Sequence, residues 1–179
     1  DNVTNLKEFS GTKLYPYGTD SNDPDTDDDD LTDGQEILTG FPGELIDGIY
    51  YTVQGFVAKY YTNATNPDTD MDYNTKDKSR KLDDWEEVNG QTRDGLINFP
   101  STNASNPDTD LDGLNDVEEV FGVWMEDFGL VTPNPCNKDT DFDELADAEE
   151  VYSIYGYITH PNLPDTDFDQ LLDGQEVLS

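Results

Sequence analysis

Apolar residues fall along this chain in short groups separated by polar stretches, without long periodic runs. Residues 49–53 and 56–61 are rich in β-branched and aromatic side chains and flank a Gln-Gly pair, which predicts a β-hairpin. Residues 123–125 and 130–132 flank the sequence EDFG and predict a second hairpin. Residues 155–159 are a shorter candidate strand. We expect the aromatic residues of these segments to form small local cores.

A second group of apolar residues follows acidic runs, each of which ends in Glu and then Ile or Val. These residues are Ile37, Val88, Val120, Val151 and Val177. The pattern predicts helices of one or two turns, which are too short to be stable alone and need a neighbouring unit. The expected fold is therefore mostly irregular α+β, an elongated tandem array of loops with short helices and small β-hairpins.

The acidic runs are five copies of one motif. Asp-Thr-Asp begins at residues 25, 68, 108, 139 and 165, and each copy continues with any residue, Asp, a Leu, a further acid and Glu. The third copy, DTDLDGLNDVEEV, has no interruption, whereas an insert at residues 73–81 divides the second. We number positions from the first Asp and name the copies loops 1 to 5. They span 25–36, 68–87, 108–119, 139–150 and 165–176 of a single repeat array covering residues 1–179.

Charge narrows the candidate partners. Asp and Glu number 42 against 9 Lys and Arg, for a formal net charge of −33. Such a field repels nucleic acid and anionic membrane surfaces and attracts cations. No stretch is apolar enough to span a membrane, so we expect no membrane insertion. Hydrophobic residues make up only 33% of the chain. We expect a protein without a large core that folds when cations neutralise it.

The spacing of the acids fits calcium. Ca²⁺ takes six to eight oxygen ligands, and a twelve-residue loop can supply them from positions 1, 3, 5, 7, 9 and 12, with a backbone carbonyl at 7 and a bidentate Glu at 12. Each loop has Asp at 1, 3, 5 and 9, Leu at 7 and Glu at 12. Loop 2 joins this set only if its insert loops out. The predicted ligands are Asp25, Asp27, Asp29, Leu31, Asp33 and Glu36; Asp68, Asp70, Asp72, Leu82, Asp84 and Glu87; Asp108, Asp110, Asp112, Leu114, Asp116 and Glu119; Asp139, Asp141, Asp143, Leu145, Asp147 and Glu150; and Asp165, Asp167, Asp169, Leu171, Asp173 and Glu176.

About five Ca²⁺ ions are expected on this reading, one for each loop. Two like charges 4 Å apart repel by about 4 kcal/mol at an effective dielectric of 20, so the loops should not close without a counter-ion. One His and one Cys leave zinc and copper without their preferred ligands. An alternative without metal is that positions 9 and 12 form a helix capping box, although this does not explain the acids at 1, 3 and 5.

The loops resemble thrombospondin type 3 repeats, especially the form found in microbial surface proteins. The resemblance rests on Asn-Pro-Asp-Thr-Asp-X-Asp-Gly-Leu-X-Asp-X-Glu-Glu at 106–119 and its looser copies. It implies calcium-dependent folding and an extracellular or cell-surface location. An EF-hand, by contrast, needs Gly at position 6 for a left-handed turn, and only Gly113 provides it. This departure argues against a paired EF-hand domain and indicates that the loops need not follow EF-hand geometry.

These observations favour a structural, calcium-binding component of a cell surface or filament. Each connecting segment precedes its loop, so copies could associate head to tail, or the loops could adjoin neighbouring repeats of a longer chain. The alternative is an adhesion module that binds a partner protein or a glycan through connector aromatics such as Tyr50 and Trp124. An enzyme is not expected, since His160 is the only His. Cys136 has no partner for an intrachain disulfide, and sequons at Asn2, Asn63 and Asn103 are compatible with secretion.

Overall fold

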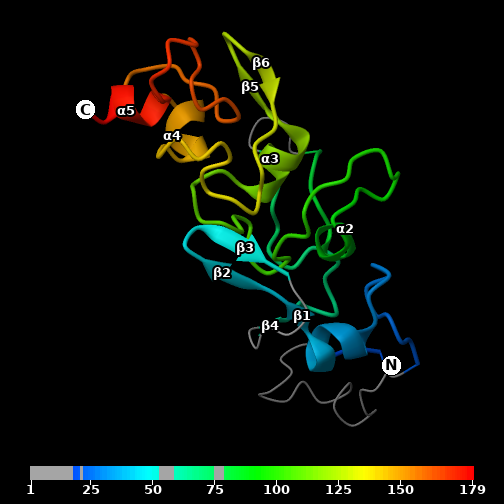
Figure 1. Ribbon diagram of the computed structural model, residues 1–179. Coiled ribbons are helices and arrows are strands. Elements are labelled where there is room, and N and C mark those ends of the chain that lie inside the picture. Colours follow the sequence, from blue (N-terminus) through cyan, green and yellow to red (C-terminus); the bar gives the residue numbers. More distant parts are fainter. Residues whose placement is uncertain (1–17, 21, 53–58, 75–78) are drawn as a thin grey trace.

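The computed structural model describes residues 18–20, 22–52, 59–74 and 79–179, which form a mixed, irregular α+β structure of short helices and two-stranded sheets. The helical segments follow one another from the bottom of Figure 1 to its top in chain order. They are η1 (Gln35–Thr39), α2 (Asp84–Asn89), α3 (Asp116–Phe121), α4 (Asp147–Val151) and α5 (Asp173–Val177). No helix among the described residues has the length and apolar character to cross a membrane.

Three antiparallel strand pairs lie in the connecting segments. Strand β5 (Val123–Met125) pairs with β6 (Gly129–Val131), so the second predicted hairpin is confirmed. Strand β2 (Glu44–Ile46) pairs with β3 (Ile49–Tyr51), and β1 (Phe41–Pro42) pairs with β4 (Lys59–Tyr60). Each pair is short, so none provides a continuous sheet around which a large core could form.

The pairing of the first predicted hairpin was wrong. Strand β3 turns back through Asp47 and Gly48 onto β2, and both turn residues have positive φ, at 50° and 78°. Such two-residue turns suit the twist of a hairpin, and this Asp-Gly pair preceded the predicted strand. Residues 53–58, which include the expected Gln-Gly turn, lie outside the described residues. The candidate strand at 155–159 is irregular.

Helices α2 to α5 begin at position 9 of their loops and η1 begins at Gln35, at position 11, and the helices are capped differently from the metal-free alternative. The side chains of Asp83 and Asn115, at position 8, accept hydrogen bonds from the backbone N–H groups of Glu86 (2.9 Å) and Glu118 (2.8 Å). Asp83 forms a capping box with Glu86. The capping pair is therefore positions 8 and 11, and the capping-box explanation for positions 9 and 12 does not hold.

The apolar core consists of small clusters between consecutive loops. Leu114 of loop 3 packs with Val123 and with Ala148 of loop 4, and Leu82 of loop 2 packs with Val117 of α3. The core thus joins one loop to the next, as the short helices require.

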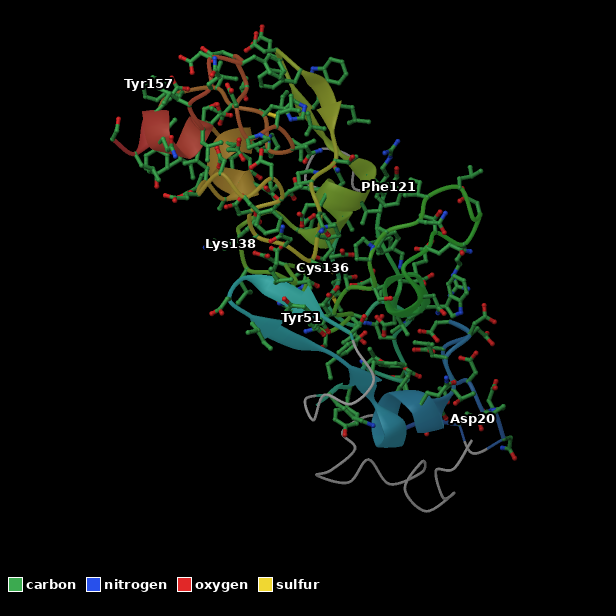
Figure 2. The ribbon with its side chains drawn as sticks, viewed as in Figure 1. Asp20, Tyr51, Phe121, Cys136, Lys138 and Tyr157 are labelled. Carbon is green, nitrogen blue, oxygen red and sulfur yellow. The ribbon has the colours of Figure 1, made fainter. Side chains whose placement is uncertain are left out.

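The connector aromatics divide between core and surface. Tyr50 is buried, and Phe41 packs against Tyr60 with ring centroids 5.4 Å apart. Trp124 and Tyr157 are exposed by 66% and 62%, and Tyr157 lies beside α5 at the outer edge of the molecule (Figure 2). The expectation that all of these rings form local cores is therefore wrong for the exposed ones.

Candidate metal centre

The five loops share one set of backbone hydrogen bonds. The N–H of the position-9 Asp donates to the carbonyl of the residue before position 1, at 3.0 or 3.1 Å in every loop. The Thr at position 2 donates both its N–H and its hydroxyl to the position-9 carboxylate, and the hydroxyl distance is 2.7 Å in loops 2 to 5. In loop 1 it is 3.1 Å. This Thr holds the position-9 carboxylate in place, and its recurrence within Asp-Thr-Asp was the sequence signal for that role.

Each loop also turns through left-handed residues. Position 4 has φ between 59° and 64° in all five loops, and position 6 is left-handed in loops 1, 3, 4 and 5. Asp30, Glu144 and Gln170 adopt this conformation at position 6 without Gly. The inference that lack of Gly questions the turn was therefore wrong. A left-handed non-Gly residue costs about 1–2 kcal/mol, so the carboxylate contacts of the loop must hold it in place.

The first three Asp of a loop converge. In loops 1 to 4, the carboxylates of positions 1, 3 and 5 each offer an oxygen within 4.8 Å of the others, so each triad could hold a metal ion. These triads are Asp25, Asp27 and Asp29; Asp68, Asp70 and Asp72; Asp108, Asp110 and Asp112; and Asp139, Asp141 and Asp143. The spacing that predicted a common site does bring these side chains together.

The closing Glu at position 12 is buried in the same four loops. Glu36, Glu87, Glu119 and Glu150 are at most 1% exposed. Neither carboxylate oxygen of Glu119 or Glu150 has a hydrogen-bond partner, and one oxygen of Glu36 and of Glu87 has none. An unpaired charge in such a setting is far too costly, so these carboxylates require either a proton or a cation.

The pKa values of these carboxyl groups are raised by the same crowding of buried acids. Burial, followed by the charge of Asp27, raises the pKa of Glu36 to about 9. Burial, followed by the charges of Asp112 and Asp108, raises the pKa of Asp110 to about 9. For Glu119, burial and then Asp110 raise the pKa well above its usual range. With pKa values of about 9, Glu36 and Asp110 hold protons at neutral pH, which a cation bound there would displace.

The position-9 Asp, predicted to serve its own loop, reaches the preceding one. Its oxygens accept from Thr of its own loop, yet Asp84 of loop 2 lies within 4.8 Å of Asp29 and Glu36 of loop 1. The charge of Asp116 likewise raises the pKa of Glu87 in loop 2, and that of Asp147 raises the pKa of Glu119 in loop 3, although burial is the main cause for both. Counting positions within one loop could not reveal this, because the neighbouring loop is brought there by the fold.

Backbone groups strengthen the same contact between loops. The N–H of Ala148 in loop 4 donates to the position-5 carboxylate Asp112 of loop 3 at 3.0 Å. The N–H of Gly174 in loop 5 donates to Asp143 of loop 4 at 2.9 Å. A Cβ at Gly174 would lie 2.1 Å from the carbonyl oxygen of Asp143, so Gly allows this close approach. Successive sites are therefore built where two loops meet.

Loops 1 and 2 are also joined by the guanidinium group of Arg93. Arg93 Nη1 bonds Asp30 at 2.6 Å, its Nη2 donates to the carbonyl of Asp29 at 2.6 Å, and its Nε bonds Asp83 at 2.5 Å. The guanidinium also lies 5.1 Å from the ring centroid of Trp85. The sequence offered no signal that Arg93, which lies in a connecting segment, would bridge two loops.

Loop 2 keeps the common geometry despite its insert. The N–H of Leu82 bonds the Asp72 carboxylate at 3.3 Å, as the position-7 N–H does in the other loops. The N–H of Asn74 donates to the carbonyl of Arg80 at 3.0 Å and closes the base of the insert. Asp84 and Glu87 therefore take the places of positions 9 and 12.

Loop 5 differs in exposure. Asp167, Asp169 and Glu176 are exposed, and Leu171 is 49% exposed, whereas the position-7 Leu of loops 1 to 4 is at most 3% exposed. Within the described part of the chain, loops 1 to 4 each have a following loop, and loop 5 has none. Its backbone pattern is intact and its position-9 residue Asp173 is buried, but Asp167, Asp169 and Glu176 lie in contact with solvent.

Comparison with protein-family models, with curated proteins and with solved structures finds no match. The chemical class of the site consequently rests on its residues. Each of loops 1 to 4 has a cluster of three Asp and a buried Glu with at least one oxygen that lacks a hydrogen-bond partner. These groups contain only oxygen ligands and are candidate sites for hard metal cations.

Proposed function

We propose that the chain is a calcium-binding structural protein in which Ca²⁺ holds each loop closed and holds successive loops together. The observation that carries this proposal is Glu119, which is fully buried with neither oxygen hydrogen-bonded, beside Asp110, Asp112 and Asp147. A cation there would offset the charges of these four carboxylates. In loops 1, 2 and 4 the closing Glu is likewise buried with at least one oxygen unpaired.

Calcium is favoured over other cations by ligand type and number. The sites offer carboxylates and a backbone carbonyl, which suit Ca²⁺ and its flexible coordination of six to eight oxygens. Mg²⁺ prefers to retain several waters, for which such crowded sites have little room. The proposed load is about five ions, with loop 5 the most solvent-accessible site.

Chelation tests this function. Excess EDTA at neutral pH should strongly destabilise the chain, lowering its melting temperature and its urea midpoint as judged by circular dichroism, and added Ca²⁺ should restore both. A site held at ten times its dissociation constant adds about 1.4 kcal/mol, so several sites together rival the stability of a small domain. Unchanged spectra and melting in EDTA would show that Ca²⁺ is not a structural component.

For the biological setting, we propose an extracellular or cell-surface array resembling thrombospondin type 3 repeats, with no catalytic role. The exposed face of loop 5 supports association with a further loop, either from a second copy placed head to tail or from a neighbouring repeat. Analytical ultracentrifugation with and without Ca²⁺ tests the first arrangement. A strictly monomeric chain at all concentrations would exclude it.

A second candidate, calcium-dependent adhesion, is favoured by one surface feature. Trp124 and Leu130 of the β5–β6 hairpin are exposed and line a cavity of about 170 Å³ that also includes Phe121. A protein or glycan ligand could use this apolar surface. Glycan-array or pull-down binding that Trp124→Ala abolishes would support adhesion, whereas binding unaffected by that change would exclude this surface.

A further inference from the structure

A single backbone contact sets the position-1 carboxylate in four of the loops. The N–H of position 6 donates to Oδ2 of the first Asp at 3.0 Å in loop 1, 3.1 Å in loops 3 and 4, and 2.9 Å in loop 5. This bond needs the left-handed residue at position 6, which turns the amide back toward the start of the loop. It orients the first ligand without adding a full charge.

Loop 2 uses an ammonium group in place of that amide. Lys81 directly precedes the position-7 residue Leu82, and its Nζ lies 3.1 Å from Oδ2 of Asp68. Lys81 does not have the positive φ of position 6 in the other loops. Arg93, by contrast, pairs with Asp30 and Asp83, which lie at positions 6 and 8 and not at positions 1, 3 or 5.

The remaining ligand atoms of loop 2 stay unpaired. Oδ1 of Asp68 and one oxygen each of Asp70 and Asp72 are buried without hydrogen-bond partners. Glu87 is fully buried, and its Oε2 also lacks a partner. The ammonium thus binds the outer oxygen of Asp68 and leaves the interior of the cluster open to a metal ion.

We propose that Lys81 is a built-in counter-ion that replaces the position-6 amide and makes loop 2 fill after loops 1, 3 and 4 and empty before them. It keeps the loop closed despite the insert, and its positive charge opposes a divalent cation in the same cluster. This inference rests on the proposed calcium binding. Loop 2 would therefore respond to changes in Ca²⁺ concentration at which loops 1, 3 and 4 remain filled.

The test compares calcium binding by the wild-type chain with that of Lys81→Gln and Lys81→Arg, measured by equilibrium dialysis with radioactive Ca²⁺. Lys59→Gln, which removes the same charge from β4, is the matched control. Lys81→Gln should tighten one weak site about tenfold, because the half-exposed Lys81 ammonium is largely screened by water. Lys81→Arg and Lys59→Gln should leave every site within about twofold of the wild type.

The same substitution made in a Glu87→Gln chain tests whether the tighter binding arises in loop 2. Glu87→Gln removes the closing ligand of that loop, so adding Lys81→Gln to it should no longer change the binding curve. If the Lys81→Gln chain tightened no site, or weakened one, the inference would be overturned, while binding by the other loops would leave the proposed function intact. A wild-type chain that binds no Ca²⁺ would overturn both. Circular dichroism in Ca²⁺ checks that each variant is folded.

Discussion

Replacing Glu150 by Gln should have opposite effects on stability with and without calcium. Glu150 closes loop 4, is 1% exposed, and has neither carboxylate oxygen hydrogen-bonded. Burial, followed by the charges of Asp141 and Asp143, raises its pKa to about 9 from an ordinary value of 4.5, against the lowering effect of the neighbouring Thr159 hydroxyl. In the metal-free fold this side chain must therefore take up a proton at neutral pH, whereas in the calcium-bound fold it would be a bidentate ligand.

The magnitude follows from proton linkage. At pH 7.5 the folded group is protonated and the unfolded group is ionised, a difference of about three pH units, or about 4 kcal/mol at 1.36 kcal/mol per unit. A Gln, which needs no proton, should recover up to about 4 kcal/mol of stability in EDTA. In Ca²⁺ the same change removes a ligand, and each tenfold loss of affinity costs about 1.4 kcal/mol.

Urea unfolding of the wild type and Glu150→Gln, in EDTA and in millimolar Ca²⁺, measures both effects. Glu126→Gln, at an exposed position in the turn between β5 and β6, is the control for loss of a charge and should change neither curve appreciably. If Glu150→Gln destabilised the chain equally in both solutions, Glu150 would be an ordinary packing residue, and the reasoning from unpaired buried carboxylates would be refuted.

Three further predictions concern proton linkage and the two contacts that shape the loops. Burial raises the pKa of the position-9 carboxyls of loops 2 to 4 to about 8 from 3.8, so in EDTA their contribution to stability is complete below pH 4 and is lost as the pH rises through 8. The urea concentration at the unfolding midpoint in EDTA should therefore decrease as the pH is raised from 5 to 8. In Ca²⁺ it should increase, because protons cease to compete with the metal ion. The same pH dependence in both solutions would contradict this prediction. Gly113→Ala places a side chain at φ 108° and should cost about 1–2 kcal/mol even in Ca²⁺, measured by thermal melting, whereas no loss would show that the turn relaxes. Arg93→Gln removes the bridge between loops 1 and 2 and should speed amide exchange in loop 1 more than in loop 4, and uniform exchange would exclude a local role.

The recurring spacing of the acids was enough to predict the candidate site. Positions 1, 3 and 5 converge because alternate Asp side chains on a tight turn face one centre, and that relation is local. The short helices after each loop were predictable for the same reason, since their start follows directly from the loop. Even the interrupted second loop could be aligned, because Leu82 and Glu87 resume the pattern after the insert.

Contacts between loops could not be predicted in this way. The position-9 Asp was assigned to its own loop, although Asp84 also meets Glu36 of the loop before it. The strand pairing of β3 was missed because the competing turn at Asp47 and Gly48 was not considered. Arg93 contacts Asp29 and Asp30, which lie 64 and 63 positions away from it in sequence. In each case the deciding partner comes from outside the repeating unit.

Because of these contacts, a bound cation would stabilise both its own loop and the junction with the next loop. Within a loop it would offset the repulsion of the Asp triad, and between loops it would offset the repulsion between the closing Glu and the position-9 Asp of the next loop, as at Glu119 and Asp147. The apolar contacts likewise join consecutive loops, since Leu114 of loop 3 packs on Ala148 of loop 4. A linear array whose units are stabilised mainly by their neighbours unfolds as coupled segments. Loss of one interior ion should therefore loosen two adjacent loops, and the position of a ligand mutation in the array should matter as much as the ligand removed.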